Sequence, residues 1–452
     1  MASEKQYIDL FHSVRALLEA HSCAALNARR DEALRLLEQY GLPTAKTERY
    51  KYINVQEAFA PDYGLNLKRL PLVENPYKSF HCNVPNLSTR LFYVVNDVVV
   101  LPETAEAESI EGLKVMTLCE AEKKMPGFIE QFYHKAAGRE YDGVTSLNTL
   151  LAQDGILVYL PAGLKLEHTL QIVSVASAGM DMMANRRILV VAEEDVEASL
   201  LFCDHAEGRQ RYLTTQVIEV FADCNAKVAL YGVEETQENC TRFCNLYVEQ
   251  QAGSKVSYNG ITLHTGMSCT RADMRLLGEE AHAEAAGAVI ADGRELVDNN
   301  ILIHHAAPAC TSDMLYKYVL DGKSVGAWAG KVLVSQGAQK TLSEQINANL
   351  CASSEARAYS QPMLEIYADD VKCNHGSTIG KLDDAALFYM RQRGIEEREA
   401  RLLLQHAFVN DVLQRVEIEQ LRDRLSYLVD LRFRGQLSRC KGCKMCKLPE
   451  VK

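Results

Sequence analysis

The sequence predicts a mainly β chain, and a β-solenoid of the parallel β-helix type is favoured over a β-sandwich. From about residue 150 onward, short β-branched runs alternate with Gly, Asn, Asp and Ala, and no helical period persists until about residue 383. Similar segments begin at residues 196, 226, 254 and 281, at intervals of 30, 28 and 27 residues. Helical spacing of apolar residues appears before and after this region. The repeats are degenerate, so the sandwich stays open as the alternative.

An α-rich N-terminal domain is predicted over residues 1–145. Apolar residues at helical spacing extend from about residue 4 to residue 40, where Gly41 and Pro43 end the pattern. The next segment, GLPTAKTERYKYIN (41–54), is basic and aromatic. We interpret it as a docking loop of this domain.

The β-helix core is predicted over residues 146–382. The repeats open with VEASL, AKVAL, SKVSY and AHAEA, each after a turn-like stretch such as Ala-Gly or Glu-Glu. SVGAW at 324 and ARAYS at 356 continue the theme after longer gaps. A period near 30 residues built from short strands is typical of coils that stack on their neighbours.

A C-terminal helical domain is predicted over residues 383–436, followed by a Cys-rich basic tail over 437–452. Asp383 or Asp384 suits a helix N-cap, and Gly394 suits the left-handed position after the helix end. Beyond it lies an apolar stripe at helical spacing: Ala400, Leu403, Leu404, Ala407, Phe408 and Leu413. Such a stripe usually packs on its own domain, and a groove for a partner is the alternative use.

Composition excludes several classes of function. The chain has 452 residues, 47% hydrophobic and 24% charged, and a formal net charge of −11, which argues against nucleic acid as a partner. No apolar run approaches the roughly 18 residues of a membrane span. The start, MASEKQYIDLF, has no apolar signal core, so a cytoplasmic location is expected. Eleven of the 14 cysteines are scattered singly, which is typical of reduced, buried thiols.

Cys373 and His375 form the leading candidate site. Alternate residues of a strand share a face, so the thiol and the imidazole are expected to point the same way. They suit a soft-metal or iron–sulfur site, or a Cys–His nucleophile pair. The alternative is a buried thiol beside a hydrogen-bonded histidine. Two ligands do not complete a metal site, so further ligands would have to come from elsewhere, including another subunit.

The tail holds a second candidate. Cys440, Cys443 and Cys446 form a C-x2-C-x2-C run that resembles part of a ferredoxin-type motif without its fourth cysteine. With an outside ligand, these thiols could bind zinc or a cluster. An autonomous metal or redox protein that uses this tail is therefore an alternative function.

Other patterns are weaker. Glu365, Asp369 and Asp370 could serve a β-helix carbohydrate-active enzyme, but solvated turn acids are the simpler interpretation. The adjacent His304 and His305 should face opposite sides of a strand, one inward and one outward. GSTIGKL (376–382) has the wrong glycine spacing for a phosphate loop, so no nucleotide hydrolysis is expected.

Three stretches, QKTLSEQINANL, PMLEIYADDVKCNHGSTIGKLDDAALFYMRQRGI and EARLLLQHAFVNDV, resemble the SufB/SufD family of iron–sulfur cluster assembly scaffolds. GLPTAKTERYKYIN is similar to the N-terminal signature of that family. The resemblance covers most of the chain and implies a right-handed parallel β-helix flanked by helical domains. The CNHGST form at Cys373 resembles the SufD branch. A SufB-type cysteine is missing, because no cysteine lies between Cys351 and Cys373.

The resemblance implies a non-catalytic scaffold subunit that pairs with a SufB-type subunit and a SufC-type ABC ATPase. A nascent iron–sulfur cluster would form transiently at the subunit interface, and none would be held stably by the isolated chain, which could form a homodimer. His375 would be a ligand shared with the partner, and Cys373 would lie close by. The helices after Asp383 would dock the ATPase. Neither the cluster type, nor a flavin, nor a role for the tail follows from the resemblance.

Overall fold

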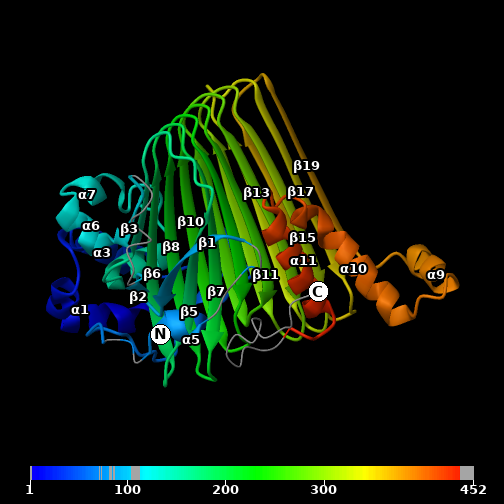
Figure 1. The fold of residues 1–452 in the computed structure, drawn as a ribbon, viewed down its shortest axis with the longest axis horizontal. Helices are drawn as coiled ribbons and strands as arrows, with labels where there is room; N and C mark the ends of the chain where they lie inside the picture. Colours follow the sequence, from blue (N-terminus) through cyan, green and yellow to red (C-terminus); the bar gives the residue numbers. More distant parts are fainter. Residues whose placement is uncertain are drawn as a thin grey trace.

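A β-solenoid forms the centre of the molecule. The computed structural model describes residues 3–70, 72, 74–80, 84, 87–102 and 112–437. Residues 156–380 wind through about eight coils, whose strands stand side by side in Figure 1. Neighbouring strands of successive coils pair in parallel, as β10 (Cys240–Gln250) does with β12 (Met267–Leu276). The predicted solenoid is therefore confirmed over the sandwich.

The strands form two stacked sheets. One sheet has ten strands, ordered β19-β17-β15-β13-β11-β9-β7-β5-β1-β2, and the other has nine, ordered β18-β16-β14-β12-β10-β8-β6-β4-β3. From β4 onward, consecutive strands alternate between the two sheets. The remaining core strands are β4 (Ile156–Leu160), β5 (Thr169–Ser177), β6 (Met182–Ala192), β7 (Glu197–Glu207), β8 (Tyr212–Ala222), β9 (Lys227–Glu235), β11 (Lys255–His264), β13 (His282–Ala291), β14 (Leu296–His305), β15 (Thr311–Leu320), β16 (Val325–Val334), β17 (Thr341–Cys351), β18 (Arg357–Ile366) and β19 (Val371–Gly380).

The corners of the coils explain the sequence repeat. Residues with positive φ recur at one corner: Asp195, Asn225, Gly253, Glu280, Ala309 and Lys340. The segments that begin at 196, 226, 254 and 281 each follow this corner directly. The next members are Cys310 and Thr341, whereas SVGAW and ARAYS lie in β16 and β18 of the other sheet. Each coil has two similar corners. The repeats predicted at 324 and 356 therefore follow the other corner, half a coil away from the first four.

The N-terminal region is mixed rather than α-rich. Its strands β1 (Thr89–Val95), β2 (Val98–Val100) and β3 (Lys114–Thr117) join the two sheets next to β5 and β4 and cover the first coil. Its helices are α1 (Glu4–Ala20), α2 (Ala24–Asn27), α3 (Arg30–Tyr40), α4 (Val55–Ala58), α5 (Pro76–Ser79), α6 (Leu118–Lys124), α7 (Phe128–Phe132) and α8 (Gly143–Leu151). The 3-10 turn Glu48–Tyr50 lies between α3 and α4. Buried α8 lies between α3 and the nine-strand sheet.

The C-terminal helices are α9 (Asp384–Gln392), α10 (Glu397–Leu413) and α11 (Glu419–Phe433). The Asp383 carboxylate caps α9 by accepting from the Ala385 N–H, and Gly394 has φ +86, both as predicted. The α10–α11 hairpin packs on the outer face of the ten-strand sheet, where its buried residues join one apolar cluster with strand residues. In Figure 1, α9 projects away from the solenoid. None of the helices in the described ranges has the length and apolar character that a bilayer crossing needs.

Candidate functional site at the open end of the solenoid

The last coil leaves both sheets unfinished. β18 pairs only with β16 and β19 only with β17, so the outer edges of both strands carry backbone groups with no partner strand in the described part of the chain. Most residues of β19 are exposed to solvent, unlike those of the inner strands. In Figure 1, β19 lies at the yellow end of the stack, opposite the N-terminal layer. Exposed sheet edges are surfaces for pairing with another chain.

Cys373 and His375 lie on one face of β19. Cys373 is half-buried and packs against the core inside the solenoid, so alternation directs His375 inward as well. Farther along this face, the Ser377 hydroxyl donates to the Ser360 hydroxyl across the coil at 2.7 Å. The strand register agrees with the predicted shared face, because Cys373 and His375 lie beside Ser343 and Gln345, two buried inward residues of β17.

Solvent exposure separates the two residues of the candidate pair. Burial raises the pKa of the Cys373 thiol above its usual value. His375 is exposed, and no hydrogen bond or ion pair to it is found within the described ranges. Of the alternative, a buried thiol beside a hydrogen-bonded histidine, the described chain shows a half-buried thiol but no hydrogen bond to the histidine. No group of three or more His, Cys, Asp or Glu side chains suited to a metal was found among the described residues, so this pair is incomplete alone.

The coil beneath this pair has a polar interior. Five successive inward residues of β17 are buried and polar: Thr341, Ser343, Gln345, Asn347 and Asn349. Only Cys351, at the end of the strand, packs against the apolar core from this face. Ser343 lies beside Cys373 in the strand register and Gln345 lies beside His375. The Gln345 amide donates to the Met363 carbonyl at 3.1 Å, and its own amide oxygen is buried without a partner in the described structure.

A hydrogen-bonded line leads inward from this coil. The Ser343 and Ser312 hydroxyls are 2.8 Å apart, and Ser312 is 2.8 Å from the Nε2 atom of His305. Burial lowers the pKa of His305 to about 4, so its ring is neutral at neutral pH. His304 faces outward and contacts the Ser335 hydroxyl at 2.9 Å, so the predicted split between the two histidines is confirmed.

Sequence reasoning missed this polar interior. A reader of TLSEQINANL would bury Leu342 and Ile346, but these side chains are exposed on the outer face. The register of β15 and β17 sets the faces instead, because Ser312 pairs with Ser343 and Met314 with Gln345. The alternation of polar and apolar residues in TLSEQINANL is therefore inverted, with apolar side chains outside and polar ones inside. This inversion was the sequence signal that could have indicated a polar coil interior.

The other predicted site residues do not converge. Cys440, Cys443 and Cys446 lie outside the described residues. Glu365 forms an ion pair with Lys331 at 2.6 Å, and Asp369 and Asp370 are exposed in the turn between β18 and β19. Gly376 and Gly380, from the rejected phosphate loop, lie within β19.

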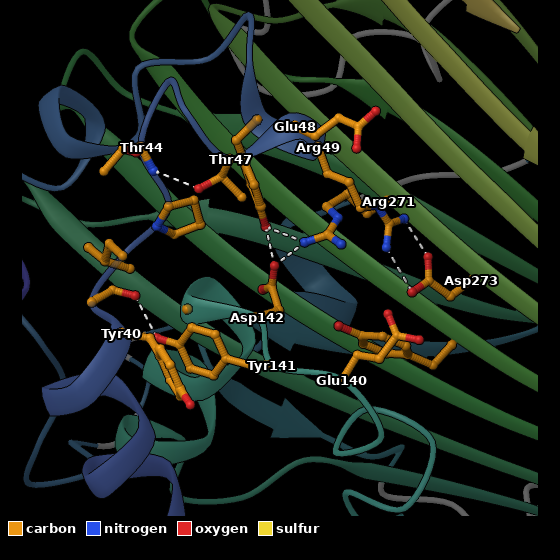
Figure 2. A pocket seen from close by; sticks show the side chains of 16 residues that line it. Tyr40, Thr44, Thr47, Glu48, Arg49, Glu140, Tyr141, Asp142, Arg271 and Asp273 are labelled. Carbon is orange, nitrogen blue, oxygen red and sulfur yellow. Dashed lines mark hydrogen bonds and ion pairs between the residues drawn. The ribbon is translucent and has the colours of Figure 1, made fainter. Parts of the chain in front are cut away.

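A cavity of about 380 Å³ lies elsewhere, between the 41–54 segment, the chain before α8 and the nine-strand sheet. Figure 2 shows Asp142 and Arg271 among the side chains that line it. The Asp142 carboxylate accepts from the Tyr50 hydroxyl at 2.7 Å and forms an ion pair with Arg271. Burial would raise the pKa of Asp142, but Arg271 and the Thr145 N–H hold it below its usual value. Arg49 forms a bidentate pair with Asp273.

The ionic groups on the floor of this cavity are therefore already paired with one another, which leaves them no free charge for a ligand. They clamp the 41–54 segment to the sheet, and Tyr52 extends the contact by stacking on Tyr359 of β18 with ring centroids 4.3 Å apart. The predicted docking loop is thus confirmed. Its role in this structure is to hold the N-terminal helices against the solenoid.

Comparison with known proteins places this architecture in a family. Residues 174–408 match the SufBD core domain of the SUF system for FeS cluster assembly, and residues 1–172 match the SufBD protein N-terminal region. An iron–sulfur cluster assembly SufBD family protein of Synechocystis is 26% identical over 432 residues, which cover 92% of this chain and 93% of that protein.

Two relatives carry a more specific name. The iron–sulfur cluster assembly protein SufD of Escherichia coli is 34% identical over 141 residues, 31% of this chain and 33% of that protein. SufD of Bacillus subtilis is 22% identical over 331 residues, 71% of this chain and 74% of that protein.

Proposed function

The chain belongs to the SufB/SufD family of iron–sulfur cluster assembly proteins, and on that premise we propose that it is a SufD-type scaffold subunit. In this role it catalyses no reaction alone. It pairs with a SufB-type subunit and a SufC-type ATPase, and a nascent cluster forms at the interface. The observation that carries the proposal is the open end of the solenoid, where an inward Cys373 and an exposed His375 lie over a polar coil.

The SufD assignment rests on the strands that form this end. β19 carries the CNHGST stretch, and β18, the strand across the coil from it, contains no cysteine. The two SufD relatives support the same branch. A subunit without the SufB-type cysteine contributes a histidine, and the partner contributes the thiolate ligands.

The partner subunit stacks on the open end. Unpaired edges of two sheets offer main-chain hydrogen bonds for β-augmentation. Apolar side chains that are exposed around this end supply contact area: Leu342, Ile346, Ile366, Tyr367 and Ile379. Large apolar side chains that stay exposed near an open sheet edge are candidates for a protein interface. Without the partner, a second copy of this chain would use the same surface and give a homodimer.

His375 then becomes a ligand for the cluster, which is cargo rather than a resident cofactor. A neutral imidazole is a suitable ligand for iron, and Cys373 lies two residues away on the same face. Ser343 and Gln345 lie in the rung beneath, where they supply hydrogen-bonding groups in place of apolar contacts.

The ATPase docks on α9 and the first half of α10. The later half of the C-terminal hairpin buries its apolar face on the ten-strand sheet through residues such as Val409, Val412 and Leu425. Exposed apolar side chains remain on α9 and early α10, at Phe388, Tyr389 and Leu403. The docking surface is therefore narrower than the whole 383–436 domain.

Anaerobic co-purification tests the assembly. The full chain is co-expressed with a SufB-type subunit and a SufC-type ATPase, and the retained proteins, iron and sulfide are measured. Ile379→Asp should release the SufB-type subunit, because it places a charge in the interface. Met180→Asp is the matched control, since Met180 is 62% exposed and Ile379 is 55% exposed, but Met180 lies in the turn between β5 and β6. Equal retention in both variants would refute the proposed surface.

The ATPase surface has its own test. Phe388→Asp should release the SufC-type ATPase and leave the SufB-type subunit bound. Tyr427→Asp on α11 is the control, because Tyr427 is also exposed but lies on the second helix of the hairpin. The isolated chain should hydrolyse no ATP, and turnover that persisted through purification would contradict a scaffold role.

A further inference from the structure

Two cysteines from distant parts of the sequence meet in the N-terminal layer. Cys23 directly precedes α2, and Cys119 is the second residue of α6. The Glu122 carboxylate accepts hydrogen bonds from the Ala24 N–H at 3.0 Å and the Ala25 N–H at 2.8 Å. Cys119 and Glu122 are three residues apart on one helix, so they share a face. The carboxylate bridge therefore ties the start of α2 to α6, and Cys23 and Cys119 pack in the same apolar cluster.

The surroundings of the two thiols differ in solvent access. Cys23 is buried in an apolar cluster that includes Leu118 and Ile129, and half-buried Cys119 packs against the same cluster. The Cys119 backbone N–H donates to the Asp154 carboxylate at 3.1 Å, and its thiol lies 3.7 Å from the Gln153 carbonyl oxygen. A small oxidant can thus reach Cys119, while Cys23 stays protected behind it.

A hydrogen bond joins the Cys119 thiol to Cys23, and it affects the protonation of Cys119. A hydrogen bond with Cys23, followed by burial and the charge of Asp154, raises the pKa of the Cys119 thiol well above its usual value. A thiol that keeps its proton is a weak nucleophile, because the thiolate is the reactive form. The pair should therefore oxidise slowly at neutral pH, and faster as pH rises.

We propose that Cys23 and Cys119 form a redox modification site that closes into an intramolecular disulfide. With a peroxide, the Cys119 sulfur attacks one oxygen, the O–O bond breaks, and a sulfenic acid and one water form. The Cys23 sulfur then displaces the second water to form the S–S bond. In sum, two thiols and one hydrogen peroxide give one disulfide and two waters. A low-molecular-weight disulfide accepts the same two electrons and leaves as two thiols.

The bond would join separate parts of the N-terminal layer. α2 belongs to the helices that precede the 41–54 segment, while α6 directly follows β3, the edge strand of the nine-strand sheet. A disulfide between them closes a long loop of chain, which reduces the freedom of the unfolded state. Oxidation should therefore stabilise the closed end of the solenoid, which is the first coil with its N-terminal cover. It should leave the open end at β18 and β19 unchanged.

Peptide mapping of the full-length protein tests the proposal. The protein is treated with hydrogen peroxide or oxidised glutathione at pH 7 and pH 9, digested without reductant and analysed by mass spectrometry. We expect a cross-linked peptide that contains Cys23 and Cys119, formed faster at pH 9. The Tm should rise by on the order of 5 °C and return after dithiothreitol. Cys119→Ser should abolish both changes, while Cys224→Ser, at a single half-buried thiol, should keep them.

A second measurement, on the wild-type protein, tests the proposal even if a cysteine variant folds poorly. Differential alkylation of the wild-type protein must show Cys23 and Cys119 losing their free thiols together. Separate glutathione adducts on each thiol, or disulfides from either one to a different cysteine, would overturn the proposal. Replacing Cys440, Cys443 and Cys446 by Ser removes the tail thiols as competing oxidation sites. Assembly with the proposed partners is not measured here, so failure of this test leaves the scaffold proposal intact.

Discussion

The first and last coils of the solenoid place opposite chemistry at equivalent positions. One ladder of paired residues in the ten-strand sheet runs from Leu170 and Leu200, in the first two coils, to Gln345 and His375 in the last two. Leu170 and Leu200 are fully buried in the apolar core, whereas His375 is exposed. The strands have the same direction and similar lengths, so the backbone does not explain the difference.

What differs is the cover at each end. β1, β2 and β3 complete the sheets beside the first coil, and the N-terminal helices pack around them. In the described structure, no strand covers β18 and β19. An apolar interior suits a coil that its own chain encloses, while a polar interior suits one that meets solvent or a partner. The comparison teaches that side chains, not backbone, distinguish the covered end of the solenoid from the open end.

The largest expected change in the free energy of unfolding is for a substitution at the closed end of the solenoid. Leu200→Ala removes a fully buried side chain and leaves a cavity, so the free energy of unfolding should fall by about 2–5 kcal/mol. Urea unfolding followed by circular dichroism measures it. A loss below 1 kcal/mol would mean that the first coil is no better packed than the last, and the comparison would fail.

The second effect is acid sensitivity of the polar interior. Burial lowers the pKa of His305 to about 4, while an unfolded histidine titrates near 6.5. Between these values the unfolded state binds more protons, so stability is full above about pH 6.5 and falls as pH drops toward 4. From pH 7 to pH 5 this residue should account for about 2 kcal/mol of lost stability.

Matched histidine variants isolate this contribution. His305→Asn should flatten the fall in unfolding free energy between pH 7 and pH 5, even if it lowers stability at both. His21→Asn changes an exposed histidine and should keep the wild-type slope. Identical slopes in the two variants would show that His305 does not cause the fall in unfolding free energy between pH 7 and pH 5.

A smaller change in the unfolding free energy is expected at the corners of the coils, which recur along the solenoid from one end to the other. Ala309 has φ +57, a conformation that glycine adopts more easily than alanine. Ala309→Gly should therefore raise the unfolding free energy by up to about 1 kcal/mol. Thermal unfolding measures the gain, and Ala285→Gly, at a buried alanine within β13, should give none. A loss of stability at Ala309 would contradict the account of the corner ladder.

The smallest effect on stability should be at His375, on the same ladder as Leu200. His375→Ala removes an exposed side chain, so the unfolding free energy should change by less than about 0.5 kcal/mol. Under the proposed function, the anaerobic complex should nevertheless lose iron and sulfide. Thermal unfolding and cluster content are measured together on the assembled complex. A wild-type cluster content would refute the ligand assignment and leave the open end without a chemical role.

Much of the fold follows from local pattern. The near-30-residue repeat marks the corners, because each corner needs the same left-handed residue. Strand alternation is enough to place Cys373 and His375 on one face. The polar interior of β17 could not be predicted this way, because Leu342 and Ile346 suggest the opposite face until Ser312 and Met314 fix the register. Likewise, β1 to β3 join the sheets through pairings that span long stretches of sequence.

From β13 to β19 the ten-strand sheet keeps one register without a shift, so each coil adds a fixed step along the axis of the solenoid. Adjacent strands lie about 4.8 Å apart, so distance along its axis is counted in whole coils. Arg415 of the C-terminal hairpin binds Glu284 of β13 and Asp313 of β15, which fixes the hairpin at a set number of steps from His375 on β19. A coil inserted between them would move the histidine by one step and keep its face. A single residue inserted within β19 would instead turn it outward.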